Sequence, residues 1–240
     1  MTKLNSFIQL FHNKKALLTG HTGFKGSWLS AWLHLIGADV YGISLETPPS
    51  QPSHFDAADF SKFVTEQRID IRKSNELSEC VNDIKPDFVF HLAAQALVRQ
   101  SYDDPVETYH TYALGTLNLL EALRLLGKKC SVVLISSDKC YNNLEWVWGY
   151  RETDSLGGQD PYSASKGAAE LVIRSHVKSF FPINGNVRIA VGRAGNVIGG
   201  GDWSQDRIVP DCVRSWVKNE TVQLRNPKAT RPWQHVLEPI

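Results

Sequence analysis

The stretch that decides the fold is KKALLTGHTGFKGSW, residues 14–28. Its apolar run, residues 16–18, predicts a short buried strand, and apolar residues recurring between 28 and 36 predict a helix directly after it. Three glycines with the spacing G-x-x-G-x-x-G join the strand to the helix: Gly20, Gly23 and Gly26. Strand, glycine turn and helix in this order are typical of a site that binds phosphate groups.

The physical basis of that prediction is the bare backbone of the turn. Glycine allows a tight turn and a close approach of the main chain to a diphosphate. The start of the following helix offers free N–H groups and the positive end of the helix dipole. The spacing is one residue wider than the usual dinucleotide-binding pattern. For these residues by themselves, an ordinary glycine-rich turn is therefore an almost equally good interpretation.

Length and composition describe an ordinary globular chain. It has 240 residues, of which 42% are hydrophobic and 21% charged, enough for a large core. The net charge of +1 and the lack of basic runs argue against nucleic acid as a partner. No apolar run reaches membrane-spanning length, and residues 1–12 lack the pattern of a signal peptide. The four cysteines are scattered without metal-ligand spacing, so we expect a cytoplasmic protein with no bound metal and no membrane contact.

Segments that favour strands alternate with segments that favour helices. Strands are expected at 39–44, around 68–71, and at 87–92, 131–136 and 187–191, and helices at 74–84, 105–126 and 162–180. This alternation predicts an α/β fold, a doubly wound and mostly parallel Rossmann-type sheet with ligands beyond the carboxyl ends of its strands. We assign residues 1–194 to a dinucleotide-binding domain that carries the catalytic residues. Residues 195–240, rich in Gly, Trp and Pro, are assigned to a partial substrate-binding portion.

A tyrosine and a lysine with the spacing YxxxK open the helix expected at 162–180. Tyr162 and Lys166 are four residues apart and therefore share one face of the helix. An ammonium group near a phenol lowers the phenol pKa from about 10, which makes tyrosine a base near neutral pH. In isolation such a pair is most often a surface pair. Its place directly after a strand and loop of this fold favours a catalytic role.

A second polar cluster, Ser136–Lys139, ends the strand expected at 131–136. The Ser137 hydroxyl can hydrogen-bond a substrate hydroxyl or the tyrosine. Asp138 and Lys139 place a carboxyl and an amine, a potential acid and a potential base, beside the same atom. The alternative is a solvated polar turn, but the position at the carboxyl end of a strand favours a catalytic site.

Four motifs together resemble the extended short-chain dehydrogenase/reductase superfamily. They are the glycine turn, HLAAQ at 91–95, GTLNLLEA at 115–122 and YxxxK at 162–166. Within it, SDKCY at 137–141 resembles the sugar-nucleotide 4,6-dehydratases. Longer stretches at 20–28, 145–152, 193–203 and 231–239 resemble the CDP-glucose 4,6-dehydratase subfamily. The resemblance runs from about residue 14 to the last residue, and the combined motifs are highly specific.

This resemblance implies a lyase that converts CDP-glucose to CDP-4-keto-6-deoxyglucose and water, in deoxysugar and lipopolysaccharide O-antigen biosynthesis. It implies that Tyr162, with its pKa lowered by Lys166, takes the 4-hydroxyl proton while hydride passes from C4 to a resident NAD. Ser137 orients that hydroxyl. Lys139 removes the C5 proton, Asp138 protonates the departing 6-hydroxyl, and hydride returns to C6. The division of roles between Asp138 and Lys139 is the part that the resemblance supports least.

The resemblance also implies binding residues. For the cofactor diphosphate they are Gly20, Thr22, Gly23, Phe24, Lys25 and Gly26; for its adenine end Asp70 and Ile71; and for its ribose and nicotinamide side Leu92, Ala93, Ala94 and Gln95. For the substrate diphosphate they are Asn196, Arg207 and Arg231. An arginine fork matches phosphate oxygens, although a plain surface charge is an alternative for both arginines.

Three features depart from the family pattern. The strand expected at 39–44 is followed by Leu45, with no acidic residue for a ribose hydroxyl, so the residues leave NAD and NADP open. Lys25 even fits an extra phosphate, and only the resemblance favours NAD. Tyr112 stands where related enzymes commonly have asparagine, which is expected to weaken catalysis. The chain stops at Ile240, whereas family members continue, so we expect only part of the substrate portion.

The resemblance predicts a homodimer formed through the helices at 105–126 and 162–180. Their apolar stripes by themselves indicate only packing on the sheet. Two other functions remain as alternatives. One is another nucleotide-sugar dehydratase or epimerase, and the other is a truncated dinucleotide-binding module without activity.

Overall fold

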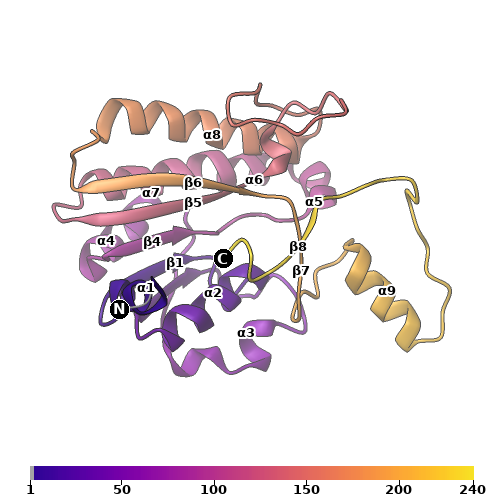
Figure 1. Ribbon diagram of the computed structural model, residues 1–240, viewed down its shortest axis with the longest axis horizontal. Coiled ribbons are helices and arrows are strands. Elements are labelled where there is room, and N and C mark those ends of the chain that lie inside the picture. The colour runs from indigo at the N-terminus through magenta and orange to yellow at the C-terminus, as the bar shows by residue number, and fades with distance from the viewer. Residues whose placement is uncertain (1–2) are drawn as a thin grey trace.

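The computed structural model describes residues 3–240, and its centre is a six-stranded sheet (Figure 1). The strands are β1 (Lys15–Thr19), β2 (Asp39–Ser44), β3 (Val64–Arg68), β4 (Phe88–His91), β5 (Cys130–Ser137) and β6 (Val187–Ala194). Their order is β3-β2-β1-β4-β5-β6, and every neighbouring pair is parallel. The order reverses between β1 and β4, which is where such sheets bind their ligands. The predicted doubly wound α/β fold is confirmed.

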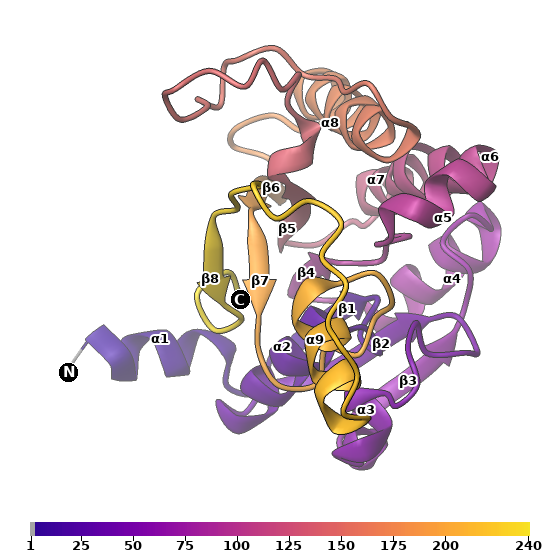
Figure 2. The same ribbon diagram turned by 90° about the vertical axis from the view of Figure 1, so that its right-hand side faces the viewer.

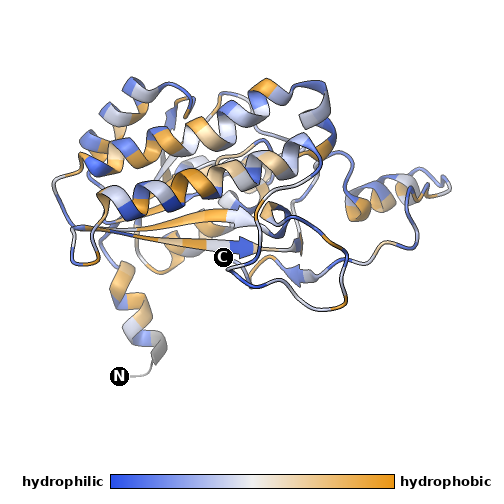
Figure 3. Ribbon diagram, turned by 90° about the horizontal axis from the view of Figure 1, so that it is seen from above, coloured by the Kyte–Doolittle hydropathy of each residue, from blue (hydrophilic) through white to orange (hydrophobic). Residues whose placement is uncertain are grey.

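Helices cover both faces of this sheet (Figure 1). One face carries α1 (Lys3–Phe11), α2 (Phe24–Leu35) and the short α3 (His54–Ala57) with the 3₁₀ turn η1 (Phe60–Lys62). The other face carries α4 (Ser74–Ile84), α5 (Val98–Asp103), α6 (Pro105–Tyr109), the π-helical segment η2 (His110–Leu114), α7 (Gly115–Arg124) and α8 (Pro161–Phe180). The helices mix hydrophobic and hydrophilic residues along their lengths (Figure 3), as expected for helices that bury one side.

Two hydrophobic cores lie on the two faces, because successive side chains of a strand point in opposite directions. In β1, Leu17 joins the core under α4, α7 and α8, whereas Ala16 and Leu18 join the core under α1, α2 and α3. All three side chains are completely buried. A continuous apolar run is what a strand covered on both faces requires.

The last part of the chain runs past the carboxyl ends of the strands (Figure 2). Within residues 195–240, β7 (Asn196–Ile198) pairs with β8 (Trp233–His235), and α9 (Ile208–Val217) lies between them in sequence. In Figure 2, α9 stands in front of the sheet edge. The proposed division at residue 194 stays a prediction. Within residues 3–240, no helix is long and apolar enough to cross a membrane.

The sequence prediction misplaced two elements. The third strand covers Val64–Arg68 rather than 68–71, because β3 is an edge strand in which Val64 is buried while most other residues are polar and exposed. Ile69 and Ile71, which suggested the strand, pack into the core after it has ended. The helix expected at 105–126 is a helical run interrupted by η2.

Removing the buried Leu120 side chain is expected to lower the free energy of unfolding by about 2–5 kcal/mol, because Leu120→Ala leaves a cavity under α7. Leu120 is 0% exposed, whereas Leu125 at the end of the same helix is 62% exposed. The control Leu125→Ala is expected to change the stability by no more than about 0.5 kcal/mol. Urea unfolding measures both, and equal losses would contradict the placement of α7 on the sheet.

Candidate active site

One cavity of about 970 Å³ lies at the carboxyl edge of the sheet, beneath the segment 195–240. It is lined by the glycine turn, by the residues that follow β3, β4 and β5, by the start of α8 and by residues from 194 to 233. All residues predicted for the site line it: Gly20, Thr22, Gly23, Phe24, Lys25, Gly26, Asp70, Ile71, Leu92, Ala93, Ala94, Gln95, Ser137, Asp138, Lys139, Tyr162, Lys166, Asn196, Arg207 and Arg231. The structure therefore brings them together, while their individual roles stay predictions.

The glycine turn has no room for side chains. A Cβ atom at Gly20 would lie 2.7 Å from the nitrogen of Ala93, and Gly20 has a φ of +77°, in the left-handed region. A Cβ atom at Gly26 would lie 2.1 Å from the Gly20 oxygen. Gly23 is the N-cap of α2 and provides no side-chain hydrogen bond, so the first N–H groups of α2 stay available to a ligand. This bare cradle fits a diphosphate.

A buried hydrogen-bond chain holds the loop after β4 against the turn. Thr19 Oγ1 accepts from the nitrogen of Ala93 at 3.2 Å and bonds His91 Nδ1 at 2.6 Å. His91 Nε2 bonds Thr116 Oγ1 on α7 at 3.1 Å. Burial, together with the charge of Lys166, lowers the pKa of His91 to about 4. His91 is therefore neutral at pH 7 and acts as a structural link.

The loop after β3 is held by residues of the 115–122 motif. A Cβ atom at Gly115 would lie 2.6 Å from Ile71 Cδ1, so only glycine permits this approach. Asn118 Nδ2 donates to the backbone oxygens of Ile71 and Arg72, at 3.0 and 3.1 Å. Asp70 accepts two hydrogen bonds from Arg72 Nε, one at each carboxylate oxygen. Burial disfavours the Asp70 carboxylate, but the hydrogen bonds from Arg72 outweigh it and lower the pKa of Asp70.

The end of β5 turns sharply through a 3₁₀ helix, η3 (Asp138–Cys140). Ser137 Oγ donates to Asp138 Oδ1 at 2.9 Å and accepts from the nitrogen of Lys139 at 3.2 Å. Lys139 Nζ lies 3.0 Å from Asp138 Oδ2. Serine, carboxylate and amine therefore form one connected group, and both charged side chains remain partly open to the cavity.

The start of α8 places Tyr162 and Lys166. The Asp160 side chain caps the helix by accepting from the nitrogen of Ser163 at 3.0 Å, and Pro161 occupies the first turn. Lys166 is 6% exposed. Burial first, and then the charge of Lys25, lower the pKa of Lys166 to about 7.

The sequence predicted that Lys166 lowers the pKa of Tyr162, but the structure does not show this effect. Lys166 Nζ lies 5.9 Å from the centre of the Tyr162 ring but only 3.9 Å from that of Tyr112. Burial raises the pKa of Tyr162, and the groups that lower it are the Tyr112 hydroxyl and Arg207. The helical spacing puts both side chains on one face, but Lys166 lies against another ring, and burial reduces its own charge.

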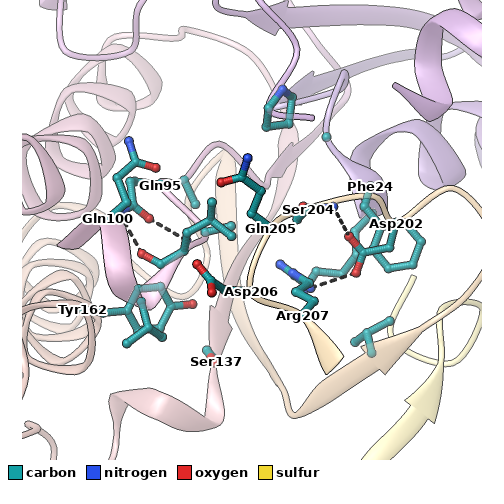
Figure 4. Close-up of a pocket in the computed structure, with 18 of the residues that line it drawn as sticks. Phe24, Gln95, Gln100, Ser137, Tyr162, Asp202, Ser204, Gln205, Asp206 and Arg207 are labelled. Carbon is teal, nitrogen blue, oxygen red and sulfur yellow. Dashed lines mark hydrogen bonds and ion pairs between the residues drawn. The ribbon is translucent and has the colours of Figure 1, made fainter. Parts of the chain in front are cut away.

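The substrate side of the cavity contains a paired and an exposed arginine. Arg207 Nη1 lies 3.2 Å from Asp202 Oδ2, a side chain that is 7% exposed (Figure 4). Arg231 is exposed and donates to the backbone oxygen of Thr230. Burial and the charge of Arg207 lower the pKa of Lys25, which also interacts with Asp138. Lys25 therefore has its charge interactions at the predicted catalytic end of the cavity.

The chain is similar to proteins of known function. The family model described as GDP-mannose 4,6 dehydratase matches residues 17–240. The chain belongs to the GDP-mannose 4,6-dehydratase family. The predicted resemblance to sugar-nucleotide dehydratases is thereby confirmed.

Individual relatives agree with this assignment. The chain is 51% identical over 234 residues to the CDP-glucose 4,6-dehydratase of Salmonella typhimurium, a match that covers 96% of the chain and 65% of that protein. It is 31% identical to a GDP-mannose 4,6-dehydratase of Vibrio cholerae, over 70% of the chain and 46% of that protein. The solved dTDP-glucose 4,6-dehydratase of Streptomyces venezuelae has the same fold, with a TM-score of 0.81 at 23% identity, over 93% of the chain and 69% of that protein.

Three residues that the sequence analysis did not assign to the site hold its parts in place. Asn118 holds the loop after β3, Asp202 holds Arg207, and Tyr112 meets both Tyr162 and Lys166. Asn118 lies inside the 115–122 motif, which offered a signal. Asp202 and Tyr112 gave no local signal for these contacts, because their partners are brought close only by the fold.

A buried ion pair links α8 to the end of β6 at this edge of the sheet. Glu170, 6% exposed, accepts from Arg193 Nε and Nη2, both at 2.7 Å, and Arg193 Nη1 donates to the Tyr141 hydroxyl at 2.8 Å. Glu170→Gln is expected to lower the free energy of unfolding at pH 7 by about 3–5 kcal/mol. The partly exposed pair of Glu121 and Arg124 is the control, and Glu121→Gln is expected to have a much smaller effect.

The stabilisation by the Glu170–Arg193 pair is expected to depend on pH. Burial disfavours the Glu170 carboxylate, but Arg193 outweighs it, so the folded-state pKa lies below the ordinary value of 4.5. The stabilisation is therefore complete above pH 4.5 and is lost as the pH falls through the folded-state pKa. Urea unfolding from pH 7 downward measures it, and a difference between the native protein and Glu170→Gln that stays constant would contradict the assignment.

Proposed function

We propose that this chain converts CDP-glucose to CDP-4-keto-6-deoxyglucose and water, with NAD as a resident cofactor. One observation carries the proposal. In a chain 51% identical to a CDP-glucose 4,6-dehydratase, one cavity is lined by a bare glycine cradle, the Ser137–Lys139 group and the pair Tyr162 and Lys166. The chain spans 65% of the length of that relative, so activity of this length of chain is part of the proposal.

The cavity fits NAD in its shape and its donors. The turn at Gly20 and Gly26 leaves no space for a Cβ atom, and the uncapped start of α2 offers N–H groups to a diphosphate. Asp70 and Ile71 line the part of the cavity beyond β3, and the residues 92–95 line the part beyond β4. When bound, NAD supplies a hydride acceptor for C4 of the sugar and later a hydride donor for C6.

The choice of NAD over NADP rests on relatives and on the position of Lys25. The solved Streptomyces venezuelae protein has NAD and TYD bound. Lys25 has charge interactions with Arg207 and Asp138, away from the end of β2 where an extra phosphate would lie. At that end, Ser44 Oγ accepts a hydrogen bond from Arg68 at 2.8 Å, and the next residue is Leu45.

Tyr162 is proposed to remove the proton from the 4-hydroxyl of the sugar, with Ser137 orienting that hydroxyl. Because burial raises the pKa of Tyr162, its phenolate form requires positive charge nearby. Arg207 provides part of it, and we assign a further part to Lys166 while it is protonated, because its Nζ lies 5.9 Å from the centre of the Tyr162 ring. The two cations therefore make the proton transfer easier without contacting the sugar carbon.

Elimination is assigned to the pair Asp138 and Lys139. A base must start neutral and an acid must start protonated, so the competent form is the neutral pair. The side chains are 3.0 Å apart, and one proton moving from Lys139 to Asp138 produces that form. Lys139 then takes the C5 proton and Asp138 protonates the leaving 6-hydroxyl, which restores the ion pair at the end of the step.

Assembly and location belong to the same proposal. Exposed large hydrophobic residues gather on the helical run from α5 to η2 and on α8: Tyr102, Val106, Tyr109, Leu114 and Leu171. Such residues are costly to leave in water, which supports a homodimer through these helices. We also propose a cytoplasmic enzyme of deoxysugar and lipopolysaccharide O-antigen biosynthesis.

A second candidate function is a dinucleotide-binding module without turnover. The observation that favours it is the coverage of only 65% of the Salmonella protein. Protein that retains NAD but forms no keto sugar from CDP-glucose would support this candidate.

Gly26→Ala is expected to reduce the NAD retained on purification by at least about tenfold, because the new methyl group displaces the turn. In the control Gly149→Ala, a Cβ atom meets nothing within 4 Å, and retention is expected to be unchanged. Nucleotide released by denaturation is identified by chromatography. Release of NADP from the native protein would contradict the cofactor assignment.

Incubation with CDP-glucose is expected to form a 4-keto sugar, detected by its near-ultraviolet absorbance in alkali. Tyr162→Phe is expected to lower the rate at least about 10²-fold, because the proposed base is gone.

Asp138→Asn is expected to allow oxidation at C4 but to stall water loss, so that the absorbance of a reduced nicotinamide persists. Turnover of GDP-mannose or dTDP-glucose in place of CDP-glucose would contradict the substrate, and loss of both steps in Asp138→Asn would contradict the role of Asp138.

A further inference from the structure

Tyr112 lies in the middle of the π-helical segment η2 and is 4% exposed. Its hydroxyl donates to the backbone oxygen of Gln95, in the loop after β4. The segment η2 packs against α8. A wider helical turn of this kind is typical of functional sites, where it changes the direction of a side chain. The backbone of Tyr112 is thus held by the packing of η2 on α8, and its hydroxyl is held by the loop after β4.

The Lys166 ammonium group lies over the face of the Tyr112 ring, 3.9 Å from the ring centre. Within residues 3–240, no hydrogen bond or ion pair reaches Lys166 Nζ. A cation over the face of an aromatic ring is attracted by the negative charge of that face, and the attraction is strongest away from water. The ring of Tyr112 therefore replaces part of the hydration that burial removes from Lys166.

The ring of Tyr112 also packs against the ring of Tyr162. The two tyrosine rings are 5.7 Å apart and almost perpendicular, at 89°, which is a favoured geometry for aromatic pairs. The hydroxyl of Tyr112 also lowers the pKa of Tyr162. Tyr112 is consequently in contact with both members of the YxxxK pair, which lie farther from each other.

We propose that Tyr112 is a positioning residue, whose ring face holds the Lys166 ammonium in its charged form and whose contact with the Tyr162 ring keeps Tyr162 beside that charge. The importance of this for catalysis rests on the function proposed above. Tyr112 itself transfers no proton and contacts no reacting atom in the proposal. Related enzymes commonly have asparagine at position 112. In this chain, Tyr112 then takes over the support of the active site that we expected from that asparagine.

The sign of the expected pH effect follows from the charge on Lys166. The titratable groups that face it are Lys25 of α2, His91 of β4, Cys140 of η3, and Tyr162 and Glu170 of α8. Loss of the aromatic face destabilises the protonated form, so Lys166 loses its proton at a lower pH. The charge is then present below the new pKa and absent above it, and the deficit is largest near neutrality.

The test measures Lys166 directly in the ligand-free protein. Lysine labelled with ¹³C at Cε is titrated by NMR, and Lys166→Met identifies the signal. Tyr112→Phe keeps the ring, and the proton dissociation constant of Lys166 is expected to stay within about threefold of the native value. Tyr112→Leu removes the ring, and the constant is expected to increase about tenfold.

Fluorinated phenylalanines at position 112 keep the test decisive even where Tyr112→Leu fails to fold. Each added fluorine weakens the negative charge of the ring face with little change of shape. The dissociation constant of Lys166 is expected to increase step by step with the number of fluorine atoms. A constant that is independent of fluorination overturns the proposal, and so does a Tyr112→Phe variant that shifts as far as Tyr112→Leu.

Turnover of CDP-glucose provides the second readout. At about pH 7, kcat of Tyr112→Leu is expected to be about fivefold below the native value, and at about pH 5.5 less than about twofold below. A deficit that is equal at both pH values indicates a merely structural role and overturns the proposal. The titration needs no substrate, so absence of turnover in the native protein contradicts the proposed function and leaves the Lys166 measurement as the test of Tyr112.

Discussion

No side chain fits where the glycine turn meets the loop after β4, and the whole cavity depends on that contact between two main chains. Gly20 touches the backbone at Ala93, and Gly26 touches Gly20. The start of α2 therefore opens into the same cavity as the ends of β4 and β5. Because all six strands are parallel, the loops that carry polar side chains gather at this one edge.

Burial makes this edge chemically distinct from a polar surface. Removal from water lowers the pKa values of Lys166 and His91 and raises that of Tyr162. Uncompensated, such groups would be inert or destabilising. The structure compensates with an aromatic face at Tyr112 for Lys166 and with short hydrogen-bond chains around His91. Of these three groups, only Lys166 is brought by burial to a pKa near neutrality.

Sequence reasoning located the central strands because buried parallel strands are continuous apolar runs, as at Ala16–Leu18. It misplaced β3, an edge strand whose polar exposed residues lack that pattern. It found no strand at Asn196–Ile198, because β7 is stabilised by pairing with β8, far away in the sequence. The residues that it predicted for the site line one cavity, because polar residues at the carboxyl ends of parallel strands converge.

The order of residues was sufficient to place the central strands, the long helices and the chemical groups at the strand ends, since these depend on local patterns. Tertiary structure decided which of those groups touch and what charge they carry. Lys166 Nζ lies closer to the Tyr112 ring than to the Tyr162 ring, and Arg207 pairs with Asp202. Burial and Coulomb interactions act through space, so their outcome depends on distances that spacing along the chain does not contain. The glycine turn predicted a cradle for a diphosphate, and the packing of Gly20 on Ala93 explains why only glycine can form it.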